Sequence, residues 1–184
     1  MADKYKSVVT PRGVAMYPWL NKPDTKFDAD GVYKMSLRVS AEEASKLQDT
    51  ITKVFTDEFG AKKLAKANFP FKPALDDDGN ETGEVVFSFK SKMQPKLYDA
   101  KGGLIKNPGD LKVGGGTIAK VNCAMAPYDK GINTGVVLYL NGVQIIELVE
   151  FGGQSSTAFG EEDGSFVSDS LASTADEDED NASF

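Results

Sequence analysis

The distribution of charge along the chain constrains its fold more than any other feature of the sequence. Of the 28 acidic residues nine lie in residues 152–184, whereas all 21 lysines and arginines precede this segment. The segment consists otherwise mainly of Gly, Ser, Thr and Ala, so it cannot bury the apolar surface that folding requires. We therefore expect residues 1–151 to form one domain of net charge about +2, and residues 152–184 to form a disordered acidic tail.

The end of this tail combines two kinds of residue. The chain closes on DEDEDNASF, with five successive acids followed by three small or polar residues and an aromatic one. A block of like charges is typical of a solvated segment. Solvation does not explain the terminal Phe184. The residues of the tail that we expect to contact a partner are Asp176, Glu177, Asp178, Glu179, Asp180 and Phe184.

The residue inventory excludes several classes of enzyme. Histidine is absent, which removes Ser-His-Asp and Cys-His catalysis and His-containing zinc sites. The single cysteine, Cys123, lies in an apolar stretch and is expected to be a buried core thiol rather than a nucleophile. One alternative enzyme, a Mg²⁺-dependent nuclease, would need its metal at Asp76–Asp78. We expect no enzymatic activity, no cofactor and no metal.

The setting of the protein follows from the same inventory. One cysteine and the lack of a charged-then-apolar N-terminal segment indicate a reducing cytoplasmic environment. The longest apolar stretch, residues 136–151, is interrupted by Asn141, Gln144 and Glu147, so we expect no membrane span.

Hydrophobic periodicity predicts several strands and one helix. Residues 31–39 alternate, with Tyr33 and Met35 on the inner face, and residues 85–92 and 117–125 alternate in the same way. Residues 41–59 have helical spacing, with Ser40 and Glu43 as a capping box and Gly60 at the end. The apolar stripe of this helix consists of Ala44, Leu47, Ile51, Val54, Phe55 and Phe59.

Two segments give weaker predictions. Residues 68–84 are rich in Pro, Gly and acid, which predicts a loop. In residues 135–148 the apolar positions change parity at Asn141-Gly142, which fits either a tight hairpin turn or a bulge in one long strand. About five strands around one helix predict a β-rich α+β domain, most simply a small, partly closed barrel.

Lysines and exposed rings together suggest a nucleic-acid ligand. Single strands are held by Lys and Arg along the phosphates and by aromatic rings stacked on the bases. Tyr128, in the predicted loop APYDKG, is the strongest candidate for stacking. Tyr17 and Trp19 could equally contact a ligand or cover the edge of the core. The other candidates are Lys34, Arg38, Lys90, Lys92, Lys96, Tyr98, Lys112 and Lys120.

A family resemblance emerges from the order of these segments. GVYKMSL, FSFK, VGGGTIAKVNCAMAPY and VVLYLNGVQIIELVEFGG are followed by an acidic tail that ends in Phe. This order resembles the single-stranded-DNA-binding proteins of short-tailed bacteriophages, from about Ser7 to the end of the chain. The resemblance implies an OB-fold, a five-stranded Greek-key barrel, with one amphipathic helix and no enzymatic activity. It also implies protection of single-stranded DNA and a role in phage DNA replication, recombination, repair and annealing.

The resemblance assigns roles to a few positions. Tyr128 matches the tyrosine that stacks on DNA, and Lys90 matches the DNA-contacting lysine of the F-x-F-K strand. Lys92 stands where the family can carry a stacking tyrosine, so a phosphate contact replaces stacking there. Lys4 loosely matches a lysine near the N-terminus. An arginine that precedes GVYK in the family is absent here, where Asp30 and Gly31 stand.

The resemblance also suggests how the tail works. A tethered acidic segment would occupy a basic groove at high effective concentration until DNA displaces it. The freed tail, with Phe184 as an apolar anchor, would then recruit the phage DNA polymerase and helicase-primase in the cytoplasm of the infected bacterial host. Such chains can also form homodimers. The alternative is that the tail mimics DNA and titrates a nucleic-acid enzyme, with the barrel as its scaffold.

Overall fold

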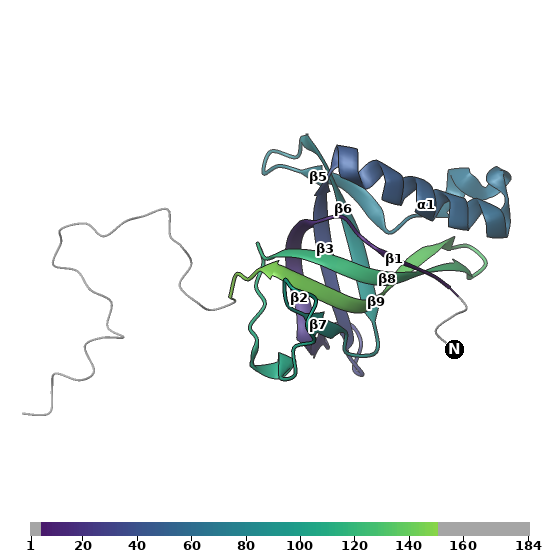
Figure 1. Cartoon of the computed structure of the whole chain (residues 1–184). Helices are drawn as coiled ribbons and strands as arrows, with labels where there is room; N and C mark the ends of the chain where they lie inside the picture. Colours follow the sequence, from purple (N-terminus) through teal and green to yellow (C-terminus); the bar gives the residue numbers. More distant parts are fainter. Residues whose placement is uncertain (1–4, 151–184) are drawn as a thin grey trace, which may run out of the picture. The chain divides into compact units, whose positions relative to one another are not determined.

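The computed structural model describes residues 5–150, so that Lys4 and the acidic tail lie outside the described residues. Within this part the chain forms nine strands, one α-helix and two 3₁₀ helices (Figure 1). None of these helices is long and apolar enough to cross a membrane. In chain order the elements are β1 (Lys6–Val9), β2 (Gly13–Asp24), β3 (Val32–Ser40), α1 (Ala41–Phe59), η2 (Ala61–Lys66), β4 (Ala67–Asn68), β5 (Phe71–Leu75), β6 (Glu81–Ser91), β7 (Lys96–Tyr98), η3 (Pro108–Asp110), β8 (Ile118–Asp129) and β9 (Thr134–Glu147).

Five of the strands close into a barrel. β2 pairs with β3, β3 with β6, β6 with β9, β9 with β8 and β8 again with β2; only the β6–β9 pair is parallel. This closed five-stranded ring is an OB-fold, as the sequence predicts. The remaining strands extend the ring: β1 lies on β8, β5 on β6, and β4 and β7 on β9.

The core follows the predicted alternation of apolar residues. On β3, Met35, Leu37 and Val39 are buried. β8 is buried over Ala119, Val121, Cys123 and Met125, so the inward face of this strand is also confirmed. Burial raises the pKa of the Cys123 thiol to about 12, which keeps it protonated and unreactive at neutral pH.

The predicted helix lies over one end of the barrel (Figure 1). It buries Ala44, Leu47, Ile51 and Phe55 against the barrel strands, and it ends before Gly60, whose φ of 81° suits glycine. The predicted capping box does not form. The Ser40 hydroxyl donates to the Glu43 carboxylate at 3.4 Å instead of accepting from a backbone N–H.

The prediction of a loop over residues 68–84 is wrong, because β5 and the start of β6 form a hairpin there. Phe69 and Phe71 stack with ring centroids 5.2 Å apart and pack against the core. Pro73 is compatible with a strand here because, among the strands of residues 5–150, β5 pairs only with β6 and therefore lies at an edge. The three aspartates Asp76–Asp78 lie in the turn, where the Asp76 carboxylate accepts the N–H groups of Asp78 and Asn80, whereas Glu81 and Glu84 lie on β6.

The Asn141-Gly142 segment is a bulge and not a hairpin. Asn122 of β8 pairs with Gly142 and Cys123 with Leu140, so Asn141 is the extra residue on one long, bent strand. β8 also continues to Asp129. Tyr128 therefore lies on a strand, opposite Gly135, and not in a loop as predicted.

Candidate nucleic-acid interface

A groove of about 950 Å³ lies between the β2–β3 loop and the tip of the β8–β9 hairpin. Lys26 and Phe27 line it from the loop, Lys130 and Asn133 line it from the hairpin, and β3 and β6 contribute residues from the barrel wall. OB-folds bind oligonucleotides at the corresponding strand face and between the corresponding two loops. We call this the main groove.

Basic side chains outnumber acidic ones along the main groove. Among the described residues that line it, four are lysines and one is acidic, namely Lys26, Lys34, Lys90, Lys130 and Asp24. Asp24 forms an ion pair with Lys34, and the hydrogen bond from Lys34 is the main reason that the pKa of this carboxyl lies below its ordinary value. A phosphate entering the groove would compete with Asp24 for the same ammonium group.

Exposed aromatic rings accompany these lysines. Tyr17 is 76% exposed, Trp19 43%, Phe27 87% and Tyr139 41%, although large aromatic side chains usually bury most of their surface. Tyr128 is half-buried in the same groove. Exposed rings beside lysines are the combination that single-stranded nucleic acid requires, because a base stacks on a ring while its phosphate meets a cation.

A local distortion of β2 accounts for the exposure of Tyr17. Met16 pairs with Ser36 and Trp19 with Lys34, so Tyr17 and Pro18 together oppose one residue of β3. Tyr17 has φ 49°, and no other non-glycine among the described residues has a positive φ. Such a conformation is strained for tyrosine, and strain of this kind clusters at ligand-binding sites.

The hairpin and Phe69, which follows β4, are held in place next to the groove. Lys63 of η2 forms an ion pair of 3.5 Å with Asp129 at the base of the hairpin tip. The hydrogen bond from the Gly131 N–H is the main reason that the pKa of the Asp129 carboxyl is lowered. Phe69, which lines the groove, packs edge-on against Phe55 of α1 with centroids 5.7 Å apart. The groove wall is therefore continuous with the helix-covered core.

The structure brings some of the predicted DNA contacts together and separates others. Lys34, Lys90 and Tyr128 line the main groove, as do the candidates Tyr17 and Trp19. Lys96, Tyr98 and Lys120 line a second groove of about 710 Å³. Three predicted residues line neither groove: Arg38, Lys92 and Lys112. Lys4 and the tail residues lie outside the described residues.

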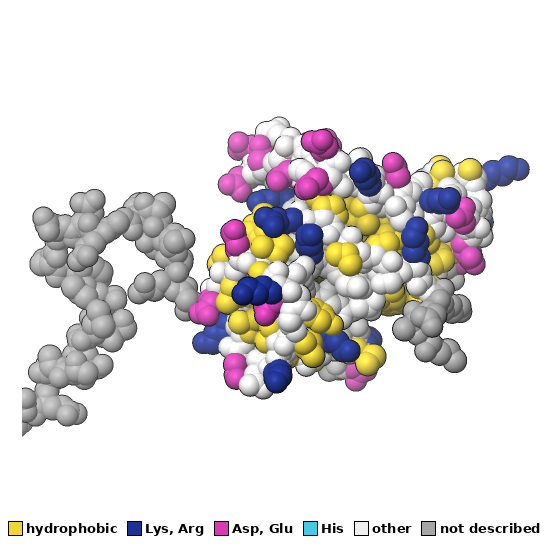
Figure 2. All heavy atoms as spheres, viewed as in Figure 1, with side chains coloured by type: hydrophobic (Ala, Val, Ile, Leu, Met, Phe, Trp, Pro, Cys, Tyr) yellow, Lys and Arg dark blue, Asp and Glu magenta, His cyan; other side chains and the backbone are white. Residues whose placement is uncertain are grey.

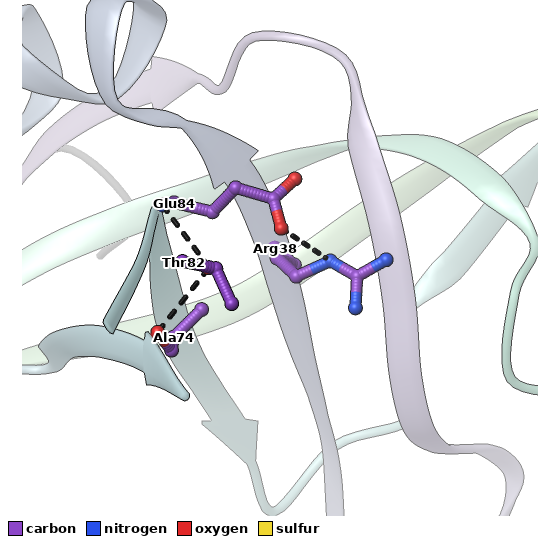
Figure 3. A network of polar contacts seen from close by, with 4 residues as sticks. All are labelled: Arg38, Ala74, Thr82 and Glu84. Atoms are coloured by element: carbon purple, nitrogen blue, oxygen red, sulfur yellow. Dashed lines mark hydrogen bonds and ion pairs between the residues drawn. The ribbon is translucent and has the colours of Figure 1, made fainter. Parts of the chain in front are cut away.

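Two of the separated cations have acidic partners. Lys92 pairs with Asp28 of the β2–β3 loop, and Arg38 pairs with Glu84 at 3.1 Å. Figure 3 shows Arg38 next to the base of the β5–β6 hairpin, where the Thr82 hydroxyl donates to the Ala74 carbonyl at 3.2 Å. Figure 2 shows acidic side chains gathered over this hairpin and the start of α1, with lysines and arginines spread among hydrophobic residues over the rest of the same face.

The sequence interpretation missed Lys26, Phe27, Lys130 and Tyr139. The first three lie on connections, where no periodicity marks a functional residue. A signal for Tyr139 existed: Leu138 and Leu140 point inward, so the residue between them points outward on the same strand. A ring at an outward position is the feature that could have identified it.

The three aspartates proposed for the nuclease alternative, Asp76–Asp78, do not form a metal site. Asp76 accepts hydrogen bonds from its own turn, and within residues 5–150 no group of three or more His, Cys, Asp and Glu residues could hold a metal ion.

Comparison with known proteins gives a consistent result for the fold. No family model and no curated protein sequence matches the chain. The solved structure of gp2.5, a single-stranded DNA binding protein encoded by bacteriophage T7, superposes with a TM-score of 0.64 at 24% identity, over 89% of this chain and 100% of that one. The single-stranded DNA-binding protein of bacteriophage Enc34 in complex with ssDNA gives 0.63 at 17% identity, over 78% and 88%. Another structure of the single-stranded DNA-binding protein from bacteriophage Enc34 gives 0.58 at 14%, over 91% and 89%. The chain therefore has the OB-fold found in the single-stranded DNA-binding proteins of bacteriophages T7 and Enc34.

Proposed function

We propose that this protein binds single-stranded DNA in the main groove, without sequence preference and without enzymatic activity. The observation that supports this most strongly is the composition of the groove, where four lysines and several exposed rings lie between the two loops by which OB-folds hold oligonucleotides. The Enc34 protein, whose fold this chain shares, is described in complex with ssDNA.

Each part of the groove has a role in this proposal. Lys34 and Lys90 neutralise phosphates, and Tyr128 and Tyr139 stack on successive bases. Stacking accepts any base because every base has an aromatic face, so affinity depends little on sequence. Duplex DNA is disfavoured because its bases are already stacked and paired and cannot reach the rings.

The acidic tail, residues 152–184, regulates access to this groove in our proposal. When DNA is absent the tail competes for the lysines, since tethering gives it a high effective concentration. DNA displaces it, and the tail with Phe184 then recruits the phage DNA polymerase and helicase-primase during replication, recombination, repair and annealing in the cytoplasm of the infected bacterium. Two chains can associate as a homodimer. These roles rest on the sequence resemblance and on the charge of the tail.

Fluorescence anisotropy of a labelled oligo-dT across a salt series tests the proposal, with the full chain compared with a version that ends at Gly153. We expect both to bind, the shorter version more tightly, with affinity falling steeply as salt rises. Oligo-U and a blunt duplex serve as ligand controls. The double variant Lys46→Ala/Lys53→Ala, on the exposed face of α1, serves as the protein control.

Two results would contradict the proposal. If neither version binds oligo-dT, the DNA-binding function is wrong and the DNA-mimic alternative becomes the better explanation of the tail. If Lys90→Ala and Lys46→Ala lose affinity equally, binding depends on overall charge and not on the main groove.

A further inference from the structure

The second groove lies on the part of the barrel formed by β1, β7, β8 and β9. It has a volume of about 710 Å³ and is lined by three tyrosines, two lysines and several amide side chains. None of the described residues that line it is acidic. The residues that matter for the argument are Tyr5, Lys96, Tyr98, Lys120 and Tyr139.

This second groove adjoins the main groove. Tyr139 lines both. On β6, Lys90 lines the main groove and the next residue, Ser91, lines the second. Tyr5 and Tyr139 form a ring pair with centroids 6.3 Å apart. A ligand that follows Lys90 to Tyr139 therefore arrives at the border of the second groove.

The local structure fixes the position of Tyr98 in this groove. Tyr98 pairs with Gln144 in the parallel β7–β9 ladder, and its ring lies over Gly142, where a Cβ would stand 3.2 Å from its Cε2 atom. The Gln144 amide donates to the carbonyls of Asp99 and Ala100, each at 3.2 Å. The Asp99 carboxylate accepts hydrogen bonds from the N–H groups of Lys101 and Gly103, which hold this carboxylate within its own turn.

We propose that the second groove binds the continuation of the same single strand, so that the DNA passes from the main groove over Tyr139 to Tyr98, Lys96 and Lys120. This inference rests on the proposed function, because it extends the path of that ligand. Three observations favour a single strand as the occupant: the absence of carboxylates among the described lining residues, the rings placed beside lysines, and the shared Tyr139.

The consequence is that this chain has a longer binding site than the main groove alone provides. OB-folds occupy from about 4 to about 16 nucleotides. Oligonucleotides near the lower end of this range would fit the main groove, whereas those near the upper end would also engage the second groove. Affinity should therefore rise with length, and the rise should depend on residues of the second groove.

The test uses the full chain, the variant Lys96→Ala/Lys120→Ala and labelled oligo-dT of about 4 and about 16 nucleotides. We expect the variant to bind the short oligonucleotide as the wild type does. For the long one the slope of log K against log salt should fall by about 1.4, since each phosphate contact contributes about 0.7 for single strands. At 0.1 M salt this corresponds to a roughly 25-fold loss of affinity. Lys46→Ala/Lys53→Ala, with the same change of charge, should affect neither length.

The other outcomes are distinguishable from this one. If the variant binds the long oligonucleotide as the wild type does, DNA does not bind in the second groove, and the proposal for the main groove is unaffected. An equal loss of affinity at both lengths would contradict the second groove in the same way. Tighter binding by the variant would mean that the groove holds the acidic tail and not DNA. If the wild type binds neither length, the proposed function itself fails.

Discussion

Lys90 of β6 and Tyr139 of β9 are register partners at the parallel junction that closes the barrel. Partners in a β-ladder project from the same face of the sheet, and both side chains here are exposed and line the main groove. The closure of the barrel therefore places a cation beside a ring, although the two residues are 49 positions apart in the sequence. This pair is the point where the main and second grooves meet.

Tyr128 provides a test of base stacking. Tyr128→Ala should weaken oligo-dT binding by about 1–3 kcal/mol, the range measured for loss of one stacking ring, whereas Tyr128→Phe should retain the affinity. Fluorescence anisotropy measures the effect, and thermal unfolding of each variant shows whether the fold is intact. Equal weakening by both substitutions would assign the effect to the hydroxyl group, which lies close to Gly135, and not to the ring.

Asp24 should compete with DNA for Lys34. Replacing the carboxylate by an amide in Asp24→Asn frees this lysine, so affinity for oligo-dT should increase roughly 2- to 5-fold at low salt, with a smaller gain at high salt. Asp49→Asn, on the exposed surface of α1, makes the same change of net charge away from both grooves. Anisotropy titrations that gave equal gains for the two variants would refute a local effect.

The Asp76 turn should make stability depend on pH in acid. The pKa of this carboxyl lies below its ordinary value of 3.8, chiefly because the Asn80 N–H donates to it. A lowered folded-state pKa contributes stability that is present above 3.8 and is lost as the pH falls through the folded-state value. Asp76→Asn should therefore be less stable than the wild type at pH 7, and the difference should vanish in strong acid.

Urea unfolding of the wild type and of Asp76→Asn across this pH range measures the difference. Asp77→Asn, beside it in the same turn, removes the same charge and serves as the control. A stability difference that stayed constant into strong acid would mean that ionisation of Asp76 has no part in the effect.

Gly135 lies where β4 pairs with β9, and it is also close to Tyr128 of the main groove. A Cβ at this position would lie 2.2 Å from the Asn68 carbonyl oxygen of β4 and 2.9 Å from the Tyr128 hydroxyl. Gly135→Ala should separate β4 from β9 and displace Tyr128, lowering stability by about 1–3 kcal/mol and weakening DNA binding. Gly109→Ala, where a Cβ meets nothing within 4 Å, should change neither property. Chemical unfolding and anisotropy measure the two effects, and a Gly135→Ala protein with wild-type stability would contradict the close packing.

The strands with strict alternation could be predicted because their pattern depends only on which face is buried. Met35 and Leu37 on β3 and Val121 on β8 are inside, as predicted. β2 was not predicted, because Pro18 and Pro23 interrupt its pattern. β5 was mistaken for a loop, because Pro73 is typical of irregular segments and only its place at the sheet edge makes it acceptable.

The candidate site was partly visible in the sequence. The lysines at outward positions of predicted strands, Lys34 and Lys90, were identified and do line the main groove. Arg38 has the same outward parity as Lys34, yet it lies beside Glu84 of β6, a pairing that depends on the register between β3 and β6. Lys92 likewise meets Asp28, 64 residues away.

The amino-acid sequence by itself determined the division of charge between residues 1–151 and 152–184, the inward faces of β3 and β8, and the extent of α1, because these depend on local composition and periodicity. Only the tertiary structure decided which cations gather in a groove and which are paired with acids. The reason is physical: the parallel junction of β6 with β9 and the approach of the β2–β3 loop to the hairpin are long-range contacts, and no local pattern encodes the partner that a side chain will meet.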